Sequence, residues 1–201
     1  MIVLQNCRYL FVDWLFAPLN TGLKMRKYEY ITVLGPNSIR LPFSELKQYG
    51  PIVSVSSHKH DVQHLDYVWT RHEKELLWFL QQRPSPVDCV TTPELYKKYV
   101  FYDEVHSFPP ISPQFNLTLD VNTDDQTLAL LSALGLCDKR ILLVGYDISD
   151  LRVLKDLRSV IMLHPDMKFY FLCNPPKTKQ LDHCSNAECI LFKDMEKLKN
   201  D

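Results

Sequence analysis

The chain has 201 residues, of which 46% are hydrophobic and 23% charged, a composition typical of a globular protein with a sizeable core. Its 23 lysines and arginines nearly balance 24 aspartates and glutamates, which excludes a global field attracting nucleic acid or an anionic membrane. No apolar run reaches the roughly 20 residues of a membrane span, and the early apolar patches precede no secretory cleavage pattern. The six cysteines lack a CxxC spacing. We therefore expect a cytoplasmic protein with reduced thiols and no membrane span.

Strands and helices alternate along the first half of the chain. Apolar, β-branched and aromatic residues predict strands at 28–34, 51–56, 66–70 and 87–90. Helical spacing predicts helices at 39–49, 72–82 and 93–99, the last with Pro93 in a favoured first-turn position. This order predicts an α/β fold, a Rossmann-like three-layer sandwich with a mainly parallel sheet, as a single domain over 1–201.

The segment 100–120 breaks the pattern, because it contains three prolines and several aromatics without a clear period. A stretch of this length without regular structure is often a lid or a binding loop. A proline-braced crossing of the surface explains the composition as well.

Regular structure resumes at 122–125, which opens an apolar helix running to residue 136. Thr123 is expected to cap this helix in a capping box with Gln126, and Gly135 is expected to close it. A strand at 140–147, a helix at 151–163, strands at 168–173 and 188–192, and a charged terminal helix follow.

The strand 140–147 ends in Gly145, Tyr146 and Asp147. In parallel sheets ligands bind beyond the carboxyl ends of the strands, so these three residues are expected at a site. The chain has only five glycines and lacks both G-x-G-x-x-G and a Walker loop. Standard dinucleotide dehydrogenases and P-loop kinases are therefore disfavoured.

Five segments in order resemble bacterial sialyltransferases and related Rossmann-like glycosyltransferases. They are VLGPNS (33–38), IVSVSS (52–57), LDYVWTR (65–71), the stretch 122–149 containing NTDDQTLALLSALGL and KRILLVGYDIS, and KFYFLCNPP (168–176). The resemblance implies transfer of a sugar from a nucleotide-sugar donor to an acceptor hydroxyl. A glycan, a lipid head group and a hydroxylated nucleic-acid base all remain possible acceptors. Since no D-x-D motif follows an apolar strand, we expect no metal and no cofactor beyond the donor.

The resemblance also implies which residues meet the donor. A loop after the first strand would face the nucleotide, two positions would contact the base and ribose, and a small turn would lie near the sugar phosphate. In that order the residues are Gly35, Pro36, Asn37 and Ser38; Ser57 and Arg71; Asn122 and Thr123; with Gly145 and Tyr146 at the later strand end. An ordinary turn and helix cap would explain the 35–38 loop as well.

The chain departs from the family because no histidine follows the strand that ends at Asp147. The general base must then come from elsewhere, and the candidates are Asp147, His58 and His60. The pattern His58, His60, Asp61 and His64 is similar to dinuclear metal hydrolases, but its spacing differs from theirs. Solvated loop histidines or a polar rim around a nucleotide pocket are the other interpretations.

Two alternatives remain at the level of function. The segment 143–150 is also similar to the G-Y-S-x-x-D turn of sirtuin-like NAD-handling domains, although VLGPNS matches their first loop poorly. A noncatalytic Rossmann-like module is the other alternative, with the aromatic residues at 99–102 and 108–110 binding a protein partner.

Overall fold

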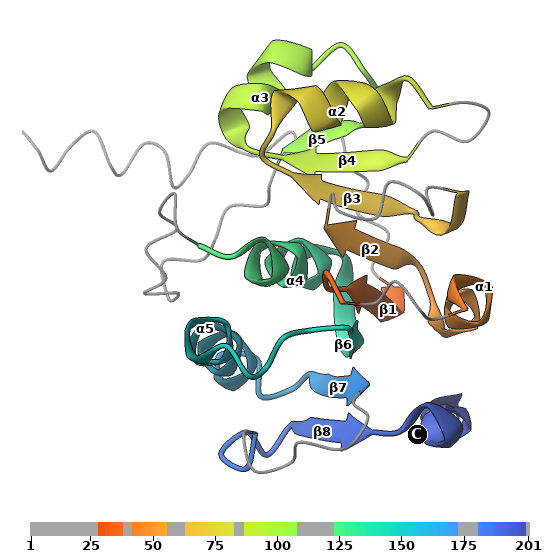
Figure 1. Ribbon diagram of the computed structural model, residues 1–201, viewed down its shortest axis with the longest axis vertical. Helices are drawn as coiled ribbons and strands as arrows, with labels where there is room; N and C mark the ends of the chain where they lie inside the picture. Colours follow the sequence, from red (N-terminus) through yellow and green to blue (C-terminus); the bar gives the residue numbers. More distant parts are fainter. Residues whose placement is uncertain are drawn as a thin grey trace, which may run out of the picture.

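The computed structural model describes residues 28–37, 42–55, 63–82, 87–107, 123–172 and 181–199. Within these ranges eight strands form one sheet in the order β5-β4-β3-β2-β1-β6-β7-β8 (Figure 1). Each pair of adjacent strands is parallel. The prediction of a Rossmann-like α/β fold with a mainly parallel sheet is confirmed.

The strands are mostly apolar runs, as expected where both faces of a parallel sheet are covered. Their bounds are β1 Tyr28–Leu34, β2 Ile52–Val55, β3 Tyr67–Thr70, β4 Asp88–Thr91, β5 Val105–Ser107, β6 Cys137–Val144, β7 Lys168–Leu172 and β8 Ala187–Ile190. The expectation that 100–120 lacks regular structure is wrong for β5, which pairs with β4 at the sheet edge. Residues 108–120 of that segment lie outside the described ranges.

The α-helices lie where the sequence predicts them, and α3 has the predicted bounds, whereas the others differ at one or both ends. They are α1 Phe43–Leu46, continued by a 3-10 turn over Lys47–Tyr49, α2 Glu73–Leu80, α3 Pro93–Tyr99, α4 Asp125–Leu136 and α5 Leu151–Met162. The first helix begins later than expected because Pro42, with extended backbone, precedes it. The charged terminal segment Phe192–Lys199 is a 3-10 helix rather than an α-helix.

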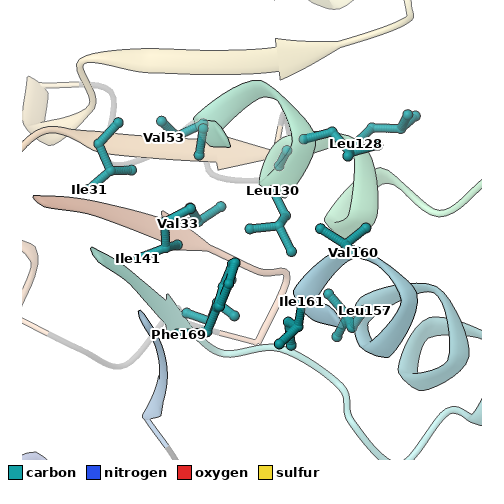
Figure 2. Close-up of a cluster of buried hydrophobic side chains, with 14 of the residues drawn as sticks. Ile31, Val33, Val53, Leu128, Leu130, Ile141, Leu157, Val160, Ile161 and Phe169 are labelled. Carbon is teal, nitrogen blue, oxygen red and sulfur yellow. The ribbon is translucent and has the colours of Figure 1, made fainter. Parts of the chain in front are cut away.

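Two hydrophobic clusters cover the two faces of the sheet. On one face, α4 and α5 pack over alternate residues of the central strands, among them Ile31, Val33, Ile141 and Phe169 (Figure 2). On the other face, buried residues of α1, α2 and the terminal 3-10 helix pack against the intervening strand positions. Because strand side chains alternate between faces, this pattern establishes three layers.

Strand order changes direction between β1 and β6. From β1 the chain moves to β2 on one side, and from β6 it moves to β7 on the other. The connection from β5 back to β6 includes α4, which packs against β1, β2 and β3. In open parallel sheets, ligands bind in the crevice at such a reversal, outside the carboxyl ends of the strands. This position in the fold is occupied by the segments that follow Leu34 and Val144.

The described part of the chain contains no helix long and apolar enough to cross a lipid bilayer. The cysteines among the described residues are all free thiols, and they are Cys89, Cys137, Cys184 and Cys189. Cys89, Cys137 and Cys184 are buried, as expected for core cysteines, and Cys189 is partly buried. Burial raises the pKa of the Cys89 thiol to about 12, so it stays protonated and unreactive at neutral pH.

Candidate functional site

The loops after β1 and β6 touch at the strand reversal. Leu34 and Val144 are partners in the β1–β6 register, and the Gly35 N–H donates to the Val144 carbonyl oxygen at 2.7 Å. The Asn37 N–H donates to the Gly145 carbonyl oxygen at 3.1 Å. A Cβ on Gly35 would lie 2.7 Å from that same oxygen, so glycine is required for this approach. Four predicted site residues, Gly35, Pro36, Asn37 and Gly145, are thus brought together.

Gly145 has a φ of 69°, in the left-handed region that L side chains rarely adopt. This conformation turns the chain out of β6 at the point where the β1 loop meets it. The backbone N–H groups of Gly35 and Asn37 already donate hydrogen bonds to carbonyl oxygens of the protein. In this conformation a ligand phosphate at the loop would therefore be bound by other groups than these two amides.

The helix α4 begins at the same edge of the sheet, but its cap differs from the predicted one. Asp124 is the N-cap, and its Oδ1 accepts from the Gln126 N–H at 2.7 Å. The predicted capping box at Thr123 is wrong, because the next residue is also a good capping residue and occupies the position. Gly135 does not close the helix, which continues to Leu136 and passes directly into β6.

The cap can be tested by a pair of substitutions. We expect Asp124→Ala to lower the free energy of unfolding by about 1 kcal/mol, since the Gln126 N–H loses its acceptor. Asp124→Asn keeps an acceptor at the same position and should leave stability nearly unchanged. Urea denaturation of both variants measures the difference, and equal losses in the two would indicate that the carboxylate charge rather than the cap stabilises the helix.

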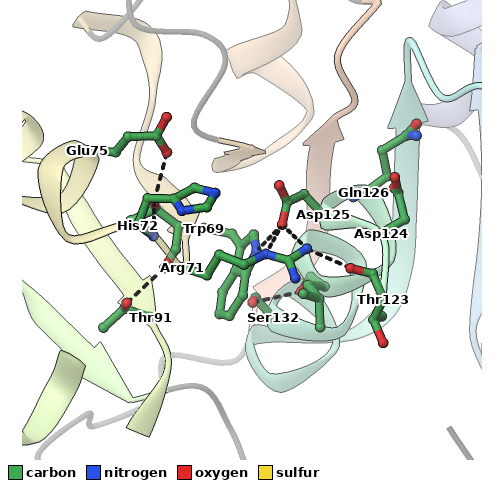
Figure 3. Close-up of polar contacts among 12 residues, drawn as sticks. Trp69, Arg71, His72, Glu75, Thr91, Thr123, Asp124, Asp125, Gln126 and Ser132 are labelled. Carbon is green, nitrogen blue, oxygen red and sulfur yellow. Dashed lines mark hydrogen bonds and ion pairs between the residues drawn. The ribbon is translucent and has the colours of Figure 1, made fainter. Parts of the chain in front are cut away.

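Arg71, at the end of β3, is bound to the start of α4. Its Nε and Nη2 donate to Asp125 Oδ1 at 2.9 and 2.6 Å, and Nη2 also donates to the Thr123 carbonyl oxygen at 2.6 Å. Trp69 Nε1 donates to the same carboxylate oxygen at 3.3 Å (Figure 3). The predicted site residues Arg71 and Thr123 therefore lie together, and Asp125 fixes the orientation of the guanidinium group.

Gln126 joins α4 to the loop after β6. Its side-chain Oε1 accepts from the Asp147 N–H at 3.0 Å, and its backbone oxygen accepts from the Tyr146 hydroxyl at 2.9 Å. Burial raises the pKa of the Tyr146 phenol well above its ordinary value, and the Asp124 carboxylate raises it further. Tyr146 is consequently a neutral hydrogen-bond donor at physiological pH, placed to hold the loop rather than to exchange protons.

Asp147 is half-exposed and lies between this anchored loop and α5. Its Oδ1 accepts from the Ser149 N–H at 3.1 Å and from Ser149 Oγ at 2.5 Å, which forms a local turn before the helix. Asp150 then caps α5 by accepting from the Arg152 N–H at 2.8 Å. The side chain of Asp147 thus has a structural role in the turn, in addition to the catalytic role predicted for it.

Five predicted site residues lie outside the described residues, namely Ser38, Ser57, His58, His60 and Asn122. Of the nearby histidines, His64 and His72 are described, and the His72 N–H donates to Thr70 Oγ1 at the carboxyl end of β3. Within the described ranges, no three His, Cys, Asp or Glu side chains gather in a way that could hold a metal ion.

The sequence interpretation did not assign Trp69, Asp125 or Gln126 to the site. Gln126 was expected only in a capping box, yet it is 5% exposed and binds a loop 21 residues away. Asp125 was expected only at the start of the helix, whereas its side chain pairs with Arg71, 54 positions earlier. The available signal in the sequence was Gln126 in the first turn of an apolar helix, because a side-chain amide that becomes buried there needs hydrogen-bond partners.

The fold and this site define a class of protein, a Rossmann-like α/β domain. The strand reversal, the two touching loops and the start of α4 lie at one edge of the sheet. Comparisons with protein-family models, with curated proteins and with solved structures give no match.

Proposed function

We propose that the protein is a glycosyltransferase that binds a nucleotide-sugar donor at the strand reversal and transfers the sugar to an acceptor hydroxyl. One observation carries the proposal: the GPN loop after β1, the first turn of α4 and the GYD segment after β6 lie side by side. They belong to two of the five segments on which the resemblance to glycosyltransferases rests, 33–38 and 122–149. They are up to 112 residues apart in the chain (35 to 147) and are joined by direct hydrogen bonds or by Gln126.

Charge favours one orientation of the donor along this edge. Asp124 and Asp125 lie at the start of α4, and Asp147 lies beyond β6, whereas the 35–37 loop carries no charged side chain. Although Arg71 neutralises Asp125, a diphosphate at the α4 terminus would still meet Asp124. The donor phosphates are therefore proposed to lie toward Asn37, and the acceptor hydroxyl toward Asp147.

A ligand screen tests the binding half of the proposal. The free energy gained from a ligand grows with its concentration over the dissociation constant, and reaches about 2.7 kcal/mol at a hundredfold excess. We expect one nucleotide among CMP, UDP and GDP, and its sugar conjugate, to raise the melting temperature of the full chain. NAD serves as the competing ligand, since a sirtuin-like domain would bind it in the same place.

A matched pair of charge substitutions locates the bound nucleotide. Asn37→Asp adds a negative charge to an exposed residue of the β1 loop and should weaken a phosphate-bearing ligand. Gln81→Glu adds the same charge at the exposed end of α2, which returns the chain toward the amino end of β4. This control should leave the ligand-induced shift unchanged, and equal weakening by both would place the nucleotide elsewhere.

Product analysis separates the three functional hypotheses. Release of free sugar from the nucleotide sugar, or its transfer to an acceptor, supports the transferase, and release of nicotinamide from NAD supports the sirtuin-like alternative. A protein that neither binds nor turns over any of these ligands would reject both enzymes and leave the noncatalytic module.

A further inference from the structure

A group of apolar side chains is exposed near the amino ends of the strands, whereas the candidate site lies at their carboxyl ends. Val100, Phe101 and Tyr102 follow α3 and are 56%, 72% and 37% exposed. The Cys89 N–H, at the start of β4, donates to the Glu104 carbonyl oxygen at 2.7 Å. The turn that carries these side chains therefore lies at the amino ends of β4 and β5, at the β5 end of the sheet (Figure 1). We call Val100, Phe101 and Tyr102 the Phe101 patch.

The Phe101 patch rests on an anchored support. The phenol of Tyr99, which is 9% exposed, and the Lys98 ammonium both donate to Glu73 Oε1 at the start of α2. The Tyr102 N–H donates to the Tyr99 carbonyl oxygen at 3.0 Å, and the ring centroids of Phe101 and Tyr102 are 4.7 Å apart. Presenting these rings to a partner therefore requires little further ordering, which favours binding.

The charges around the patch fit a copy of the same surface. Lys97 precedes it in the last turn of α3 and Asp103 follows it, and both side chains are exposed. A twofold contact needs a self-complementary surface, and opposite charges before and after the patch in the chain supply one if Lys97 of one copy pairs with Asp103 of the other. The formal net charge of −1 gives no long-range repulsion between copies.

We propose that the Phe101 patch is the centre of a twofold interface through which two copies of this chain associate. Exposed aromatic residues at the centre of an interface contribute most of the binding free energy, while flanking charges fix the orientation. The interface lies at the amino ends of the strands, so it leaves the candidate site at their carboxyl ends open. Self-association and nucleotide binding can therefore be tested independently of each other.

Sedimentation velocity of the full chain, over a concentration series from low to high micromolar, tests the proposal. We expect the wild type to shift from monomer to dimer, and Phe101→Glu to weaken association by at least about tenfold. Met162→Glu is the matched control, because Met162 is 63% exposed on α5, on the β6 and β7 side of the sheet. A monomeric wild type, or an equal effect of the two substitutions, would overturn the proposal. Thermal unfolding of Phe101→Glu that matches the wild type at a concentration where both are monomeric shows that the fold is retained.

A charge exchange tests the twofold arrangement itself. Lys97→Glu should weaken association, since it places two carboxylates opposite each other. Adding Asp103→Lys to that variant restores opposite charges across the interface and should recover the dimer. A double variant that stays as weak as Lys97→Glu would reject the arrangement.

Discussion

Gly50→Ala is expected to lower the free energy of unfolding by about 3 kcal/mol or more. Gly50 joins the 3-10 turn Lys47–Tyr49 to β2 and has a φ of 106°, where an L residue is strained. A Cβ there would lie 2.2 Å from the Tyr30 carbonyl oxygen, a backbone atom of the central strand β1. Relief of this clash would require β1 or the turn to move. The hydrogen bond from the Thr32 N–H to the Pro51 carbonyl oxygen, at 2.9 Å, holds the two together and opposes that movement.

Gly135→Ala is the control for the loss of a glycine. Gly135 lies inside α4, where alanine is favoured over glycine by up to about 1 kcal/mol. The two substitutions add the same methyl group and should change stability in opposite directions. Denaturant unfolding of both variants measures this difference, and a Gly50→Ala protein as stable as the wild type would show that the turn relaxes freely.

Most strands were predictable because each is a local pattern of apolar residues bounded by turn residues. The range predicted for β1 is the range observed, and α3 begins at Pro93 as expected. The strand β5 was missed because it has three residues inside a segment whose prolines dominate the pattern. Similarly, Thr123 and Asp124 are both capping residues, and local sequence does not decide which of them begins the helix.

The site was only partly predictable, because its contacts depend on strand order. That Gly35 and Gly145 follow strands could be inferred from sequence, but their contact requires β1 and β6 to be neighbours. The pairing of Arg71 with Asp125 likewise follows from the passage of α4 over β3. Local patterns therefore predict which residues lie at the carboxyl edge, and topology decides which of them meet.

Asp147→Asn is expected to reduce turnover of the proposed transferase by about 100- to 10,000-fold, with donor affinity nearly unchanged. The carboxylate would accept the proton of the acceptor hydroxyl, which an amide cannot do. Asparagine keeps an oxygen that can accept from the Ser149 N–H and Oγ, so the turn before α5 should survive. The substitution thus removes the basic group while retaining the local structure.

Asp150→Asn is the matched control, since it removes the same charge three residues later, and asparagine is as good an N-cap for α5 as aspartate. Its turnover should stay near that of the wild type. Steady-state rates and nucleotide affinities for both variants, together with His60→Ala, decide the assignment. If Asp147→Asn is fully active and His60→Ala is inactive, the base lies in the histidine segment. If both remain active, neither residue is the base, and the proton must be removed by a group outside the proposed set.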